Sequence, residues 1–153
     1  KSEHGGIIKD GAKMVNAVAN SVVPKFTIIT GNSFGAGNYA MCGKAYDPRL
    51  IVSWPWAELA VMGGSQAAKV LVQIQESTLK KQGKEITTEE HNALVEKITQ
   101  NYTKQTKVEY SAARIWVDAI INPLDTRKWI STGIEVANNS PITDKFNLGV
   151  IQV

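Results

Sequence analysis

A glycine-rich junction is the segment of this sequence whose residue types and spacing best suit chemistry. The run Ile28–Met41 predicts a buried strand, a tight turn over Gly31–Gly37 and the start of a helix. Such a junction leaves several backbone N–H groups unpaired at the positive end of a helix dipole, where an anion or a developing oxyanion can bind. The alternative interpretation is a glycine turn that serves packing alone.

Two nucleotide-binding motifs overlap this junction, and both fit poorly. Gly35-x-Gly37-x-x-Ala40 matches the dinucleotide fingerprint and follows a strand. The helix after it is too short for a crossover connection, because Gly43 and Pro48 interrupt it. A phosphate-binding P-loop is excluded, because Asn38 stands where that motif requires its first glycine. A nucleotide site is therefore disfavoured.

Side-chain chemistry elsewhere in the sequence is sparse. His4 and His91 have no partners at metal-ligand spacing, which indicates solvated or capping roles and no metal in this domain. Ser33 lies beside glycines but not in a nucleophile elbow. No side chain is an obvious acid, base or nucleophile. This pattern suits a site in which the protein contributes backbone N–H groups and a cofactor brings the base.

Composition places the chain among ordinary α/β domains. It has 153 residues, 43% of them hydrophobic and 20% charged, and a net charge of +3 that is spread along the sequence. This charge does not favour nucleic acid, and no apolar run approaches the roughly 18 residues of a membrane span. The single cysteine, Cys42, excludes an intrachain disulfide. Because the sequence starts at Lys1 without a methionine, we expect it to be part of a longer chain.

Hydrophobic periodicity predicts alternating helices and strands. Helices are expected over Ile7–Asn20, Asn38–Cys42, Ser65–Lys81, Glu89–Lys104, Ala112–Val117 and Thr126–Ala137. Strands are expected over Lys25–Thr30, Leu50–Trp54, Glu58–Val61 and Ala119–Ile121. Thr87 or Thr88 is expected to cap the helix that follows it. The sequence shows no clear internal repeat.

Ordered motifs along nearly the whole chain resemble the C-terminal domain of the carboxyltransferase (β) subunits of biotin-dependent acyl-CoA carboxylases. The matching segments are Gly11–Val15, Val23–Lys25, Gly35–Arg49, Trp54–Pro55, Val61–Ala68, Ser111–Arg114, Asp118–Pro123 and Asp125–Arg127. The run Gly-Ala-Gly-Asn-Tyr, residues 35–39, is similar to methylcrotonyl-CoA and geranyl-CoA carboxylases. Propionyl-CoA and acetyl-CoA types usually carry Gly-Gly-Ala-Tyr-Asp there, so Tyr39 replaces an aspartate that borders the acyl pocket. Trp56, Glu58 and Ser65 depart from the methylcrotonyl pattern and leave the acyl group open.

This resemblance implies an α/β fold of the crotonase-like (ClpP/crotonase) type, a superhelix of ββα units. Residues 1–153 would form one carboxyltransferase C-terminal domain within a longer two-domain subunit. Each active site would lie where the N-domain of one subunit meets the C-domain of another, so the enzyme would be a homo-oligomer. Carboxybiotin would enter on the side of this domain and acyl-CoA on the other side. Carboxybiotin would release CO2 in the site, and the remaining biotin anion would remove the acidic proton of the acyl-CoA.

The resemblance also implies roles for individual residues. The amides of Ala36 and Gly37 would stabilise negative charge on the ureido oxygen of biotin, and Phe34, Gly35, Tyr39, Gly63 and Gly64 would line the biotin and substrate site. In this fold a partner donor comes from a loop on an earlier strand, at or before Lys1, so this chain would hold only part of the oxyanion hole. Since it also lacks the N-domain, the isolated chain is expected to be inactive.

Cofactors, partners and location follow from the same resemblance. Biotin would be carried on a separate carrier domain, and a coenzyme A thioester would be the substrate. The partners would be acyl-CoA, a biotin carboxylase or carrier subunit and the N-domain of a second carboxyltransferase subunit, with no nucleic acid and no membrane. The location would be a bacterial cytoplasm or the mitochondrial matrix. Two other functions remain open at this point: a subunit of a biotin-dependent acyl-CoA decarboxylase, and a non-catalytic assembly fragment.

Overall fold

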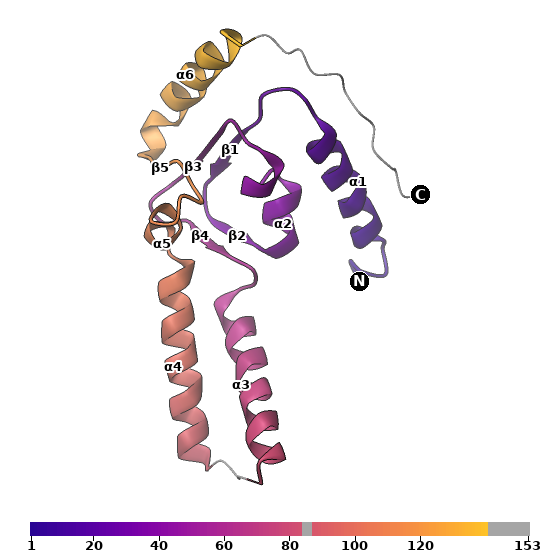
Figure 1. The fold of residues 1–153 in the computed structure, drawn as a ribbon, viewed down its shortest axis with the longest axis vertical. Helices are drawn as coiled ribbons and strands as arrows, with labels where there is room; N and C mark the ends of the chain where they lie inside the picture. The colour runs from indigo at the N-terminus through magenta and orange to yellow at the C-terminus, as the bar shows by residue number, and fades with distance from the viewer. Residues whose placement is uncertain (84–86, 141–153) are drawn as a thin grey trace.

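Two successive ββα units form the centre of the molecule. The computed structural model describes residues 1–83 and 87–140 (Figure 1). The first unit comprises β1 (Phe26–Ile29), β2 (Asn32–Phe34) and α2 (Gly35–Ala40). The second comprises β3 (Leu50–Ser53), β4 (Glu58–Ala60) and α3 (Gly64–Lys81). The predicted α/β class and its ββα units are confirmed, although the repeat is structural and leaves no clear trace in the sequence.

The strands of the second unit pair in parallel with those of the first. β1 pairs with β3, with Phe26 opposite Leu50, and β2 pairs with β4, with Phe34 opposite Ala60. β5 (Ala119–Ile120) pairs in parallel with the other side of β3, which gives the order β1-β3-β5. Since β3 is central, its Ile51 and Val52 are 1% and 0% exposed, as expected of a parallel strand covered on both faces.

The hydrophobic core lies around β3, β4 and α5 (Val108–Ala112). It is small and mostly aliphatic, and consists of Ile29, Ile51, Ala57, Leu59, Val108 and Val117. Val108 begins α5, and Val117 lies in the turn between α5 and β5. The core therefore joins the two ββα units to the later part of the chain.

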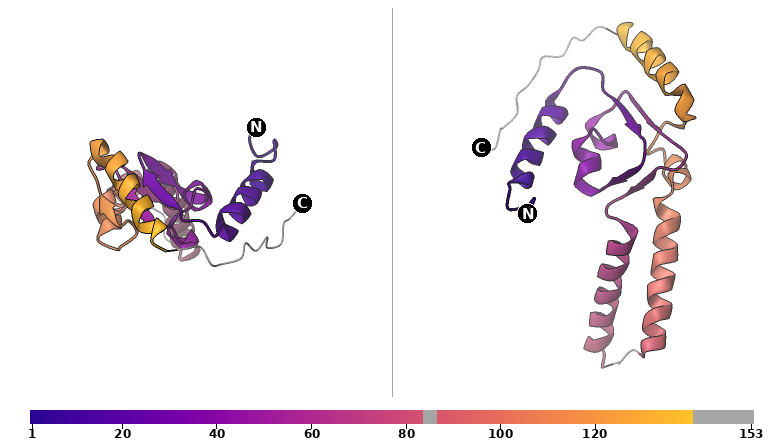
Figure 2. Two further views of the ribbon diagram at one scale, coloured as in Figure 1. Left: turned by 90° about the horizontal axis from the view of Figure 1, so that it is seen from above. Right: turned by 180° about the vertical axis from the view of Figure 1, so that it is seen from behind.

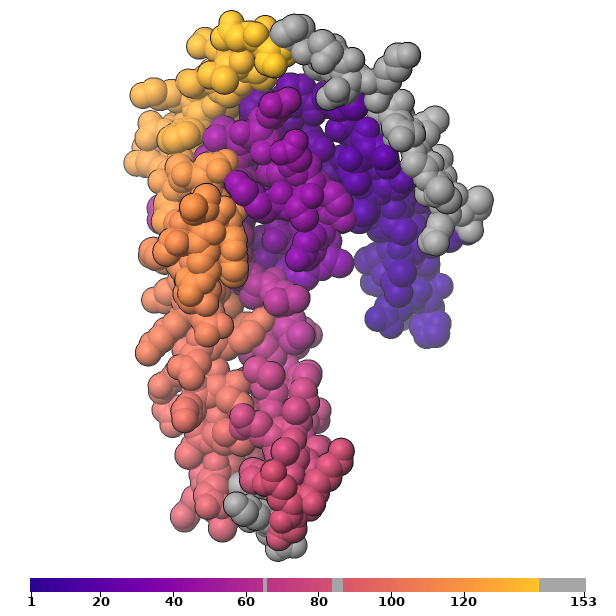
Figure 3. Space-filling model, viewed as in Figure 1, coloured from indigo at the N-terminus to yellow at the C-terminus, as the bar shows by residue number. Residues whose placement is uncertain are grey.

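A long helical hairpin projects from this centre (Figures 2 and 3). It is formed by α3 and α4 (Thr88–Thr106), which pack side by side. Thr87 caps α4 as predicted, in a capping box in which its hydroxyl accepts from the amide of Glu90. The amide of Thr87 donates in return to the Glu90 carboxylate, and this bond lowers the pKa of Glu90 below its ordinary value. His91 Nδ1 lies 2.6 Å from Glu76 Oε1 and links the two helices.

The first and last helices of the described structure are mostly exposed. α1 (Ile7–Asn20) packs against α2, and α6 (Thr126–Asn138) follows η2 (Pro123–Asp125). Neither helix contains a buried residue in the described structure, and Ile7 and Ile8 of α1 are 55% and 74% exposed. In the described ranges, no helix has both the length and the hydropathy that a membrane span requires.

Two predicted helices were placed wrongly, and two short elements were not predicted. β2 was not predicted, and α2 starts at Gly35 instead of Asn38. α5 covers Val108–Ala112, and the predicted helix over Ala112–Val117 is a series of turns in which Ile115 has a φ of 59°. A β-branched residue strongly disfavours this left-handed conformation, so tertiary contacts impose it. η1 (Lys44–Tyr46) was also not predicted.

Candidate functional site

The carboxyl ends of β2 and β4 bring the predicted site residues together. Phe34 is the last residue of β2, and α2 begins immediately after it at Gly35. β4 ends at Ala60, and α3 begins at Gly64 after the short loop Val61–Gly63. Because the two strands are parallel and in register, both helices begin at the same edge of the sheet, where helix N-termini favour negative charge.

Gly35 permits close contact between the two helix starts. Its φ is +60°, and a Cβ atom there would lie 2.9 Å from the carbonyl oxygen of Val61. A Cβ atom at Gly63 would lie 3.9 Å from the ring of Phe34. Phe34 and Gly35 are thus held against the loop Val61–Gly63, and only glycine fits at position 35.

The amides of Ala36 and Gly37 lie in the first turn of α2, where backbone N–H groups have no acceptor within the helix. The N-cap residue is Phe34, whose side chain has no hydrogen-bonding atom. Ala36 and Gly37 are exposed, and within the described part of the chain nothing outside the adjoining backbone of α2 lies within 4 Å of a Cβ atom built at Gly37. This geometry can accommodate an acceptor atom such as an oxyanion, so it supports the predicted role, which stays a prediction.

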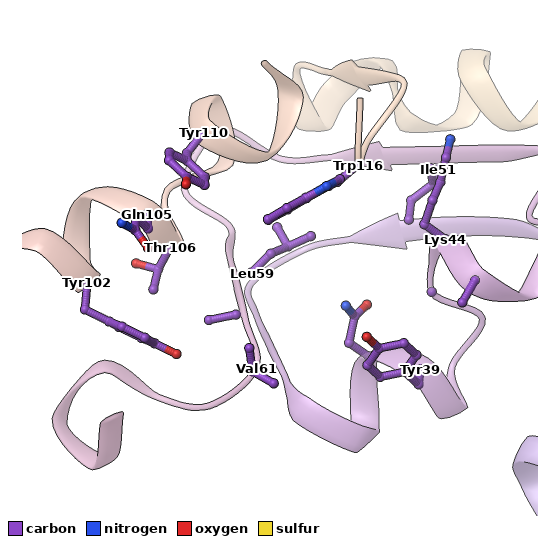
Figure 4. A pocket seen from close by; sticks show the side chains of 14 residues that line it. Tyr39, Lys44, Ile51, Leu59, Val61, Tyr102, Gln105, Thr106, Tyr110 and Trp116 are labelled. Atoms are coloured by element: carbon purple, nitrogen blue, oxygen red, sulfur yellow. The ribbon is translucent and has the colours of Figure 1, made fainter. Parts of the chain in front are cut away.

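A cavity of about 470 Å³ lies beside this edge of the sheet (Figure 4). Its wall is mainly apolar and aromatic, and includes Tyr39, Leu59, Val61, Tyr102, Tyr110 and Trp116. Tyr39 and Tyr102 extend into it from opposite sides, with Val61 between them. Tyr39 is 49% exposed and contacts Tyr46 edge to face, with ring centroids 6.4 Å apart. Tyr39 therefore borders a cavity, whereas Ala36 and Gly37 lie outside its wall.

Sequence reasoning missed two polar contacts at this cavity. Asp118 accepts from the amide of Ile51 at 2.8 Å and from Lys44 Nζ at 3.2 Å, and so joins the residue before β5 to β3 and to η1. Tyr102 donates from its hydroxyl to the carbonyl of Met62 at 2.8 Å. The helical spacing of Leu94, Ile98 and Tyr102 indicates that Tyr102 lies on the inner face of α4, but no local pattern identifies its partner.

Metal ligands do not gather in the described residues, where His, Cys, Asp and Glu side chains nowhere form a group of three or more that could bind an ion. His91 instead pairs with Glu76, and Cys42 is buried. The chemistry available at the edge of the sheet is therefore that of backbone donors beside an aromatic cavity.

Comparison with known proteins agrees with this arrangement. The model of the carboxyl transferase domain family matches residues 1–148. The methylcrotonoyl-CoA carboxylase β chain of Arabidopsis thaliana, a mitochondrial protein, is 50% identical over 144 residues, which are 94% of this chain and 24% of the relative. The solved geranyl-CoA carboxylase β subunit of P. aeruginosa superposes with a TM-score of 0.78 at 36% identity, over 99% of this chain and 28% of that one. The transcarboxylase 12S structure, described as a hexamer assembly with hydrolysed methylmalonyl-coenzyme A bound, gives a TM-score of 0.77 at 31% identity, over 95% and 26%.

The parallel ββα units and the paired helix starts are those of a crotonase-like carboxyltransferase domain. This chain belongs to the carboxyl transferase domain family, as its motifs predicted. It spans about a quarter of the length of these relatives.

Proposed function

We propose that this chain supplies the biotin-side half of a site that transfers a carboxyl group from carboxybiotin to an acyl-CoA. The observation that carries the proposal is the exposed first turn of α2, which presents the amides of Ala36 and Gly37 at the carboxyl ends of two parallel strands. The similarity to carboxyltransferase β subunits over nearly the whole chain supports it.

Biotin, carried on a separate domain, would bring the carboxyl group and provide the base for the acyl-CoA. Its ureido oxygen is a compact acceptor, and two successive amides at a helix start without a side-chain cap are free to donate to such an atom. The amides of Ala36 and Gly37 would hold this oxygen and stabilise the negative charge that develops on it. Phe34, Gly35, Gly63 and Gly64 would shape the surface around the donors, because their close contacts fix the two helix starts.

The acyl group would be branched and unsaturated, as in 3-methylcrotonyl-CoA. Tyr39 supports this choice, because its aromatic ring borders an apolar cavity and suits a planar conjugated chain. A carboxylate at the same position would be poorly solvated beside such a group.

The remainder of the proposed enzyme would lie outside this chain. We propose that residues 1–153 form the C-terminal domain of a two-domain subunit in a homo-oligomer, with acyl-CoA bound by the N-domain of another subunit. A biotin carboxylase or carrier subunit would deliver the biotin. The location would be the mitochondrial matrix or a bacterial cytoplasm.

The assembled enzyme that contains this chain tests the proposal. Together with its biotin carboxylase, ATP and labelled bicarbonate, it should fix label into 3-methylcrotonyl-CoA as an acid-stable product. Avidin, which sequesters biotin, is the matched control and should abolish incorporation. A folded, assembled enzyme that fixes no label into any branched, straight-chain or short acyl-CoA would contradict the proposed function.

A further inference from the structure

We propose that Tyr102 is a positioning residue for carboxyl transfer, since its hydroxyl holds the loop Val61–Gly63 against the start of α2. Through that loop it would keep the amides of Ala36 and Gly37 in the orientation that charge stabilisation requires. This inference rests on the proposed function of the α2 start. It adds a residue of α4 that would act through the loop, and whose ring also lines the cavity beside Tyr39.

Tyr102 contacts the segment between β4 and α3 at two points. Its hydroxyl donates to the carbonyl of Met62 at 2.8 Å, in the middle of the loop. Its ring covers the backbone at the first residue of α3, because a Cβ atom at Gly64 would lie 3.6 Å from Tyr102 Cδ1. One side chain of α4 therefore fixes both the loop and the start of α3.

The loop in turn contacts α2 through backbone atoms, which have little freedom to adjust. The carbonyl oxygen of Val61 lies so close to Gly35 that a Cβ atom there would come within 2.9 Å. Gly35 is the residue directly before Ala36, the first proposed donor. A change in the position of the loop is therefore transmitted to the first turn of α2 without an intervening flexible side chain.

The end of α4 that carries Tyr102 is itself anchored. Lys107, just beyond α4, forms an antiparallel bridge with Glu58 at the start of β4. Thr106 and Val108, on either side of Lys107, are 3% and 1% exposed. The segment from β4 to α3 is thus held at its beginning by Lys107, which bridges Glu58, and at its end by Tyr102.

The contribution of the Tyr102 hydroxyl to holding the loop can be separated from that of its ring by substitution. Tyr102→Phe keeps the ring against Gly64 and removes only the bond to Met62. Thr103→Val is the matched control, because it removes a hydroxyl from the neighbouring residue of the same helix. That hydroxyl donates to the carbonyl of Thr99 at 2.8 Å, within α4 itself.

Both variants should be measured in the assembled enzyme. Tyr102→Phe should lower kcat about three- to tenfold, the factor that one hydrogen bond of ordinary strength represents, with the KM for acyl-CoA unchanged. Amide hydrogen exchange over residues 33–41 should be faster than in the wild type, whereas Thr103→Val should leave kcat and this exchange unchanged.

The outcomes separate this inference from the proposed function. Wild-type kcat in an active Tyr102→Phe enzyme, or unchanged exchange over residues 33–41, would overturn the positioning role and leave the proposed function standing. A wild-type enzyme without carboxyl transfer would remove the proposed function, and hydrogen exchange would still report whether Tyr102 holds the loop. A purely structural role would lower the melting temperature without changing exchange in α2 below that temperature, and this result would also overturn the proposal.

Discussion

Gly35 and Val61 are in backbone contact, since a Cβ atom on Gly35 would lie 2.9 Å from the carbonyl oxygen of Val61. The two residues follow the paired ends of β2 and β4, where Phe34 lies opposite Ala60. Their contact joins the first turn of α2 to the loop before α3.

We expect Gly35→Ala to destabilise the protein by at least about 2 kcal/mol, because it combines a left-handed φ with a steric clash against backbone. Gly37→Ala is the control two residues away. Its new methyl group meets nothing within 4 Å in the described structure, so stability should be unchanged or slightly higher. Thermal unfolding of both variants measures the difference, and equal melting temperatures would contradict this description of the junction.

Gly37→Pro should lower turnover of the assembled enzyme by roughly 10²–10³, because it removes one of the two proposed donor amides. The KM for acyl-CoA should change little, since acyl-CoA binds to the other half of the site. Gly37→Ala retains the amide and should retain most of the turnover. Wild-type turnover in a folded Gly37→Pro enzyme would exclude the amide of Gly37 as a donor.

Tyr39 should determine the preference between acyl groups. The wild-type enzyme should favour 3-methylcrotonyl-CoA over propionyl-CoA, and Tyr39→Asp should shift the ratio of kcat/KM values toward propionyl-CoA. The Tyr39 ring is half-exposed at the cavity wall, where it can contact a bound acyl group. A side chain in that position can change the ratio of kcat/KM values between two acyl groups. Competition between the two thioesters in one reaction measures the ratio. A clear preference of the wild type for propionyl-CoA would refute the role of Tyr39.

Ser111→Ala should stabilise the protein by about 1 kcal/mol, because the Ser111 hydroxyl is fully buried and its Oγ has no hydrogen-bond partner among the described residues. Thr106→Val should have the opposite effect on stability, because the Thr106 hydroxyl has a hydrogen-bond partner. The Thr106 hydroxyl is also buried but donates to the carbonyl of Thr103 at 3.0 Å, so its removal should cost about 1 kcal/mol. Urea unfolding of the two variants tests both signs, and a destabilised Ser111→Ala would indicate a partner for this hydroxyl.

The isolated chain should self-associate. Trp56 and Val61 are 60% and 74% exposed, and α1 exposes apolar residues along its length, so several apolar surfaces have no cover in the described structure. Ile51 is buried in β3 and does not contribute to these surfaces. Light scattering over a range of concentrations measures the association. A constant mass of 16.7 kDa without binding of a hydrophobic dye would show that the domain is self-sufficient.

The sequence predicted the elements whose signals are local. The helix Ile7–Asn20 agrees with the structure at both ends, and the cap at Thr87 agrees because a capping box involves only neighbouring residues. The strand Phe26–Ile29 is shorter than predicted by one residue at each end. These elements were predictable because hydrophobic periodicity and capping residues can be read from neighbouring positions in the sequence.

The elements that it did not predict depend on distant partners. Asn32–Phe34 is a strand because it pairs with Glu58–Ala60, and nothing in three residues beside a glycine indicates this. The glycine junction was identified as a candidate site, but the contacts that fix it come from Val61 and Tyr102 on other elements. The family, in contrast, was evident from motifs distributed along the whole chain.

The α3–α4 hairpin separates two neighbouring strands of the sheet along the chain, which bears on the order of folding. β3 and β5 are neighbours in the sheet, yet the whole hairpin lies between them in the sequence. Joining them directly would require closure of a long loop, which is entropically costly and slow. Once the hairpin has formed from contacts between sequential helices, its two ends meet where Tyr102 covers Gly64, and the effective loop becomes short. We therefore expect the hairpin to form early and β5 to join the sheet last, so that substitutions in β5 alter the unfolding rate more than the folding rate.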